Sequence, residues 1–212
     1  MPPHNDIIDF ENTVPIAEGR DQWVFQDPID ESKLIKVPRP SEKPRLLKRY
    51  AIWRYRRLRS WQREMNEYLA LLARTGTHCD RIARFHGFCD TSKGPGILVE
   101  KIVGTGGNLA PTFAEFIKLH SADPDVLTAL REDTVRFFDT LAQRRIDFHD
   151  CHSRNVLVTG IETPKLTIVD GLGTASVFPI TQFSQRVFLH RANEGRKKLL
   201  RMIDTRLASH AG

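Results

Sequence analysis

The sequence has few cysteines and no long apolar run. Its 212 residues include only three cysteines, Cys79, Cys89 and Cys151. An odd number of cysteines without a regular spacing argues against a disulfide framework and is typical of a reducing compartment. No apolar run reaches the roughly twenty residues that a membrane-spanning helix needs, and residues 1–10 are polar and lack the apolar core of a signal peptide. We therefore expect a soluble, cytoplasmic protein with no transmembrane segment.

Acidic residues are scarce in one part of the chain, where positive charge is concentrated. The formal net charge of the whole sequence is +6, but ten Lys and Arg lie between Arg39 and Arg63 against the single acid Glu42. This segment is also predicted to be helical, with Arg45 to Arg63 on a basic face and an apolar stripe formed by Leu58, Trp61, Met65, Leu69 and Leu72. Such a face suits an anionic partner: a nucleotide, a nucleic acid, an anionic membrane or an acidic protein. Basic helix faces are also common where only solvent contacts them.

The apolar pattern predicts mainly strands in the first half of the chain and mainly helices in the second. Five segments between turn-forming residues have strand character: 14–17, 22–26, 33–37, 83–90 and 97–102. Four segments have helical periodicity: 45–74, 112–120, 124–145 and 179–207. Two further short strands, 156–159 and 165–169, should form a hairpin.

These elements predict an α+β fold with two lobes in one domain. The first lobe, residues 1–103, would contain a five-stranded antiparallel sheet and one long helix. The second lobe, residues 104–212, would be reduced and mainly helical. The glycine-rich residues 104–108 would form the hinge between them.

Two acidic loops flank the predicted hairpin. The first, Phe-His-Asp-Cys-His-Ser-Arg-Asn at 148–155, carries Asp150 and Asn155, and the second, Val-Asp-Gly-Leu-Gly at 169–173, carries Asp170. Asp150 can act as a base on a substrate hydroxyl, and Asn155 and Asp170 can be ligands of Mg²⁺. Arg154 and His152 can offset charge on a transferred phosphoryl group, the histidine only when it is protonated. This set of residues is that of the phosphoryl-transfer site of protein kinases.

The first lobe contains residues suited to binding the nucleotide phosphates of ATP. Lys36 lies on the predicted strand 33–37, where the kinase template has its phosphate-binding lysine, and a carboxylate on the following helix would hold it in place. Glu64 is the predicted partner of Lys36, with Glu67 as the competing carboxylate. A lysine at the end of a strand is more often simply exposed, but the order of the whole residue set favours the functional interpretation.

Other features of the template are incomplete or weak. When residues 17–24 are aligned with the kinase glycine-rich loop pattern G-x-G-x-x-G-x-V, only Gly19 and Val24 match. Ala17 and Gln22 occupy the positions of the other two glycines. The adenine edge would contact the backbone of Glu100 and Ile102, with Val99 behind it. The adjacent potential ligands at 149–152, and the histidines and cysteines at 78, 79, 86 and 89, have no standard zinc-site spacing.

With these residues placed, the chain resembles the YrbL family of PhoP regulatory network proteins over nearly its whole length. The most similar stretches are 18–36, 63–64 with the helix that follows, 84–87, 155–157 and 170–173. The resemblance implies a diverged protein-kinase-like fold and a regulatory role. Some relatives lack the aspartate of the catalytic loop, whereas this chain keeps Asp150, Asn155 and Asp170.

The chain also departs from ordinary protein kinases. Phe148-His149-Asp150 replaces His-Arg-Asp, Asp-Gly-Leu-Gly replaces Asp-Phe-Gly, and no Ala-Pro-Glu follows. A peptide substrate would therefore have little surface to lie on. The sequence predicts a Mg²⁺- and ATP-dependent phosphotransferase with an unknown phosphate acceptor. The alternatives are a pseudokinase-type regulatory module that binds ATP without turnover, and a basic protein that binds nucleic acid or membrane.

Overall fold

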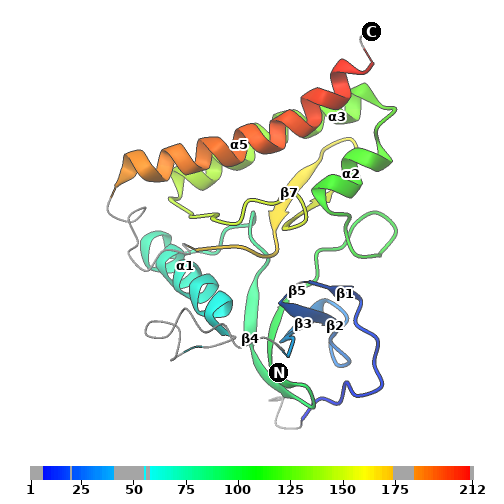
Figure 1. The fold of residues 1–212 in the computed structure, drawn as a ribbon, viewed down its shortest axis with the longest axis vertical. Helices are drawn as coiled ribbons and strands as arrows, with labels where there is room; N and C mark the ends of the chain where they lie inside the picture. Colours follow the sequence, from blue (N-terminus) through cyan, green and yellow to red (C-terminus); the bar gives the residue numbers. More distant parts are fainter. Residues whose placement is uncertain (1–6, 20, 41–54, 56–57, 174–183, 211–212) are drawn as a thin grey trace. The chain divides into compact units, whose positions relative to one another are not determined.

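The structure, a computed structural model, describes residues 7–19, 21–40, 55, 58–173 and 184–210 (Figure 1). Contacts along the chain group it into two units. The first unit comprises Met1–Arg59 and Ala83–Lys101, and the second comprises Ser60–Ile82 and Ile102–Gly212. The predicted boundary between two lobes at residues 103 and 104 stays a prediction.

The first unit is built on a five-stranded antiparallel sheet with the strand order β1-β2-β3-β5-β4. Its strands are β1 Ala17–Glu18, β2 Gln22–Gln26, β3 Lys33–Pro38, β4 Phe85–Thr91 and β5 Gly94–Glu100. The central strand β3 is buried along its whole length. Phe10, from the segment before β1, stacks on Phe25 of β2 with ring centroids 4.2 Å apart. This sheet, together with the helices of the second unit, confirms the predicted α+β class.

The first strand is shorter than the predicted 14–17. The strand β1 contains only Ala17 and Glu18, which pair with Val24 and Trp23 of β2, and the N–H of Ile16 also donates to the Val24 carbonyl at 2.8 Å. Pro15 has no N–H group to donate to a neighbouring strand, and the N–H of Thr13 donates to the carbonyl of Phe10 at 3.2 Å in a turn. The pairing with β2 therefore stops at Ile16, and the residues before Pro15 follow a turn.

The turn between β4 and β5 is tighter than the sequence predicted. Residues 91–96 were expected to form a turn, but β5 already begins at Gly94 and includes Pro95. The Thr91 hydroxyl donates to the Gly94 carbonyl at 2.6 Å, which closes the turn. A proline is tolerated here because β3 pairs with β5 only from Ile97 to Glu100, so the missing N–H of Pro95 interrupts no bond to β3. The strand also ends at Glu100 and not at residue 102.

In the second unit, the described residues form four helices and a hairpin. The helices are α1 Arg59–Thr75, α2 Phe113–Leu119, α3 Pro124–Gln143 and α5 Gln185–Ala208, and the hairpin strands are β6 Val156–Thr159 and β7 Lys165–Ile168. Helices α3 and α5 lie side by side and antiparallel (Figure 1), joined by Arg131–Asp204 at 2.8 Å and Arg196–Asp139 at 3.0 Å. Their apolar faces, with the hairpin and α2, enclose the core of this unit.

Local capping explains where α3 begins and ends. Asp123 caps its first turn through the backbone N–H groups of residues 125 and 126, and Pro124 occupies the first helical position. The helix stops at Gln143, before the predicted 145, because Arg145 adopts the left-handed conformation with φ +52°. The N–H of Ile146 donates to the Leu141 carbonyl at 2.8 Å, as in a Schellman motif, although the left-handed residue is not glycine.

The long basic helix that was expected from residue 45 lies largely outside the described residues. Of residues 41–57 only Tyr55 is described, and its carbonyl accepts a hydrogen bond from the N–H of Leu58 at 2.8 Å in a turn before α1. The predicted anionic partner of Arg45 to Arg63 therefore stays a prediction. No helix within the described ranges is long and apolar enough to cross a membrane.

Candidate functional site

The two acidic loops lie side by side in the second unit. The hairpin β6–β7 pairs Val156 with Ile168 and so brings the ends of both loops together. Three backbone hydrogen bonds continue this pairing: Val169 N to Asn155 O at 3.0 Å, Asp150 N to Gly171 O at 3.1 Å, and Gly173 N to Asp147 O at 2.8 Å. The predicted residues Asp150, Asn155 and Asp170 therefore belong to one connected cluster.

The side chain of Asn155 is fixed by Asp150. Its Nδ2 donates to the Asp150 carbonyl at 2.9 Å and to the Asp150 carboxylate at 3.2 Å. Because the amide N–H groups are used within the loop, the amide oxygen is the atom of Asn155 that can bind a cation. Asn155 is buried, whereas Asp150 is exposed and can meet a substrate.

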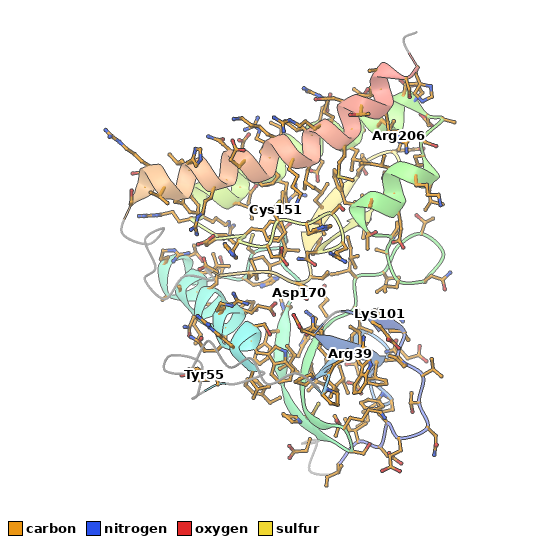
Figure 2. The ribbon with its side chains drawn as sticks, in the orientation of Figure 1. Arg39, Tyr55, Lys101, Cys151, Asp170 and Arg206 are labelled. Carbon is orange, nitrogen blue, oxygen red and sulfur yellow. The ribbon has the colours of Figure 1, made fainter. Side chains whose placement is uncertain are left out.

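Gly171 allows the second loop to approach Asn155 and Asp150 closely. Its φ is +88°, and a Cβ at this position would lie 3.0 Å from Asn155 Nδ2 and 3.0 Å from the Asp150 carbonyl oxygen. The N–H of Gly171 donates to the Asp170 carboxylate at 2.7 Å and to Glu64 Oε1 at 3.2 Å. Asp170 is half-buried and, in the view of Figure 2, lies farther from α5 than Cys151 does.

The buried face of α1 carries two carboxylates. The sequence pattern predicted an apolar stripe that included Leu69, but Leu69 is exposed and Glu64 and Glu67 are buried. Both glutamates are held by backbone N–H groups of the acidic loops: Glu64 by Gly171, and Glu67 by Asp147 at 3.0 Å. Apolar periodicity cannot predict this face, because hydrogen bonds from distant segments offset the cost of burying the carboxylates.

Two basic side chains, His152 and Arg154, follow Asp150 in the first loop. Burial lowers the pKa of the His152 imidazole, and Arg154 and Lys198 lower it further. This favours neutral His152 at neutral pH, so Arg154, which is exposed, is the better source of positive charge. Lys198 of α5, which sequence reasoning missed, donates from Nζ to the Cys151 carbonyl at 2.9 Å.

The predicted nucleotide-binding residues of the first unit gather on its sheet. Lys36 is buried on β3, opposite Val24 of β2 and Ile97 of β5. Gly19 forms the tight turn after β1, where its N–H donates to the Gln22 carbonyl at 2.8 Å. Val99 and Glu100 lie on β5, and the Glu100 carboxylate accepts the N–H of Arg84 at 3.0 Å.

The residues predicted to bind ATP belong to both units. Ile102, like Glu64, belongs to the second unit, while Lys36 belongs to the first. The ion pair between Lys36 and Glu64 and the adenine contacts therefore stay predictions. Within the part of the chain that the structure describes, no three His, Cys, Asp or Glu side chains come together as a metal-binding group.

Comparison with known proteins gives one family. The sequence model described as PhoP regulatory network protein YrbL matches residues 8–205, which is nearly the whole chain. No curated protein matches the chain significantly. The chain therefore belongs to the family of PhoP regulatory network protein YrbL.

Proposed function

We propose that this protein is a Mg²⁺- and ATP-dependent phosphotransferase with an unknown phosphate acceptor and a regulatory role. The observation that carries the proposal is the cluster of Asp150, Asn155 and Asp170 on two hydrogen-bonded loops. Two acids and an amide are the groups that phosphoryl transfer requires for orienting a hydroxyl and holding a cation.

Each residue of the cluster has a distinct role in the proposal. Asp150 is exposed and would accept the proton of the acceptor hydroxyl. The amide oxygen of Asn155 and the carboxylate of Asp170 would hold Mg²⁺, which when bound neutralises charge on the phosphates. Arg154 would offset negative charge on the transferred group, since the lowered pKa of His152 favours its neutral form.

ATP is the proposed phosphate donor. Lys36 is buried on β3, where the kinase template has its phosphate-binding lysine. The nucleotide phosphates and the carboxylate of Glu64 would be its partners in the ATP complex. Ala17, Gly19 and Val24 would contact the phosphates and the nucleoside, and Val99, Glu100 and Ile102 would contact the adenine.

Ligand-induced stabilisation tests the proposal. A ligand at 100 times its Kd raises the free energy of unfolding by about 2.7 kcal/mol, so millimolar Mg·ATP should raise Tm in a thermal-shift assay. Asp170→Ala should abolish the shift. Asp139→Ala, which removes an exposed carboxylate of α3 that pairs with Arg196, should keep it. No shift with the wild type, or an equal shift with Asp170→Ala, would contradict the proposal.

A nucleotide-binding module without turnover is the second candidate. It is favoured by the glycine-rich loop, in which only Gly19 and Val24 match the template. Under this alternative Mg·ATP stabilises the protein, but purified wild type and Asp150→Asn consume ATP at the same background rate. Turnover that Asp150→Asn abolishes would exclude it.

A further inference from the structure

Glu67 lies at the point where α1 meets the start of the first acidic loop. We infer that Glu67 is a positioning residue, which together with Arg74 holds the backbone at Asp147 and thereby places Asp150 and Asn155. The inference rests on the proposed function for its catalytic consequence, but its structural part can be tested without catalysis.

Asp147 is the junction between both acidic loops and α1. Its N–H donates to Glu67 Oε1 at 3.0 Å, and its carbonyl accepts the N–H of Gly173 at 2.8 Å. Both Glu67 and Asp147 are buried. Only two residues separate Asp147 from Asp150, so a displacement at Asp147 has little chain in which to be absorbed before it reaches the exposed carboxylate.

Arg74 connects the same junction to the end of α3. From the last turn of α1, its Nη2 donates to the carbonyls of Arg144 at 3.3 Å and Arg145 at 3.0 Å, and it lies 3.6 Å from Glu67 Oε1. These carbonyls follow the last turn of α3, where helix carbonyls lack partners within the helix. Arg74 therefore bonds to the chain immediately before Asp147, while Glu67 bonds to Asp147 itself.

A charged group is a costly way to satisfy a single backbone N–H. Burial raises the pKa of Glu67, and the nearby Asp147 carboxylate raises it as well, whereas the N–H of Asp147 and Arg74 lower it. Holding the N–H of Asp147 in place requires only a hydrogen-bond acceptor of the right size, which a glutamine also provides. The neutral variant Glu67→Gln and the truncation Glu67→Ala therefore separate loss of charge from loss of the acceptor.

The experiment compares four variants of the full chain. Glu67→Ala and Glu67→Gln change the junction. Asn66→Ala, at the exposed neighbouring position of α1, controls for helix propensity, and Leu71→Ala, at a buried apolar position of the same helix, controls for lost stability. For each variant we would measure Tm, kcat, KM for ATP, and amide hydrogen exchange at Asp147 and Asp150. The N–H of Leu166, which donates to the Asp133 carboxylate at 2.9 Å, serves as the internal reference for exchange.

We expect Glu67→Ala to lower kcat by about 10- to 100-fold, as loss of a residue that orients a catalytic group does, with KM for ATP little changed. Exchange at Asp147 and Asp150 should become faster in this variant, while Leu166 stays protected. Glu67→Gln should keep kcat and protection near the wild-type values. Leu71→Ala should lower Tm without selective loss of protection at Asp147.

Three results would overturn the inference. The first is unchanged exchange at Asp147 and Asp150 in Glu67→Ala. The second is a fall in kcat in Leu71→Ala equal to that in Glu67→Ala when both are assayed well below their Tm. The third is no recovery of either kcat or protection in Glu67→Gln. If the wild type consumes no ATP, the proposed function fails, and the exchange measurements alone decide whether Glu67 positions the loop.

Discussion

At Gly173 the second acidic loop lies close to the backbone of α1. Its φ is +77°, and a Cβ built on it would lie 2.5 Å from the carbonyl oxygen of Arg63 and 3.0 Å from the Arg63 carbonyl carbon. The atoms in the way belong to the helix backbone, which cannot rotate aside as a flexible side chain can. Gly173→Ala should therefore force α1 and the loop apart.

The cost has two parts that the structure separates. An L side chain in the left-handed region costs about 1–2 kcal/mol, and an added carbon in a packed site costs typically about 1–3 kcal/mol. We therefore expect Gly173→Ala to lower the free energy of unfolding by roughly 2–5 kcal/mol. In a chain of this size each kcal/mol corresponds to about 2–4 °C in Tm.

A matched glycine isolates the steric part. Gly107 has φ +83°, but a Cβ there would meet nothing within 4 Å. Gly107→Ala should therefore show only the backbone cost, and the difference in Tm between the two variants measures the close approach of loop and helix. Thermal unfolding followed by circular dichroism provides the measurement. Equal losses in the two variants would refute the contact between Gly173 and Arg63.

Two further changes test other local features. Arg145→Gly should raise the free energy of unfolding by about 0.5–1 kcal/mol, because glycine relieves the left-handed φ of +52° while it adds entropy to the unfolded chain; a lower denaturation midpoint would contradict this. Burial raises the pKa of Cys151 to about 12 and that of Cys89 to about 11. Both thiols should therefore react with iodoacetamide at pH 8 much more slowly in the native than in the unfolded protein. Mass spectrometry can measure the modification rate at each site, and equal rates in the two states would contradict the prediction.

Features that depend on neighbouring residues were predictable from the sequence. Alternation and turn residues predicted β2 and β6 with the bounds that the structure has, and the start of α3 at Pro124 followed from the position of proline in helices. The spacing of Asp150 and Asn155 also predicted that one loop carries both residues, and the structure adds a hydrogen bond of 3.2 Å between their side chains. In each case, the residues that determine the structure lie within one short segment of the sequence.

Features that depend on distant segments were not predictable in this way. The close approach of Gly173 to Arg63 and the bond from Lys198 to Cys151 join residues far apart in sequence, and neither has a local pattern. The burial of Glu64 and Glu67 even contradicts the local pattern, since an apolar stripe was the better fit to helical periodicity. These contacts required the positions of α1, α5 and both loops, which no single segment encodes.

The two buried carboxylates of α1 contact different acidic loops. Oε1 of Glu67 accepts the N–H of Asp147 at 3.0 Å, at the start of the first loop, and lies 3.6 Å from Arg74. Moving this carboxylate away would leave the N–H of Asp147 unsatisfied and buried. Oε1 of Glu64 accepts the N–H of Gly171 at 3.2 Å in the second loop. Because the carbonyl of Gly171 accepts the N–H of Asp150 and the carbonyl of Asp147 accepts the N–H of Gly173, the contacts of one helix face hold both loops together.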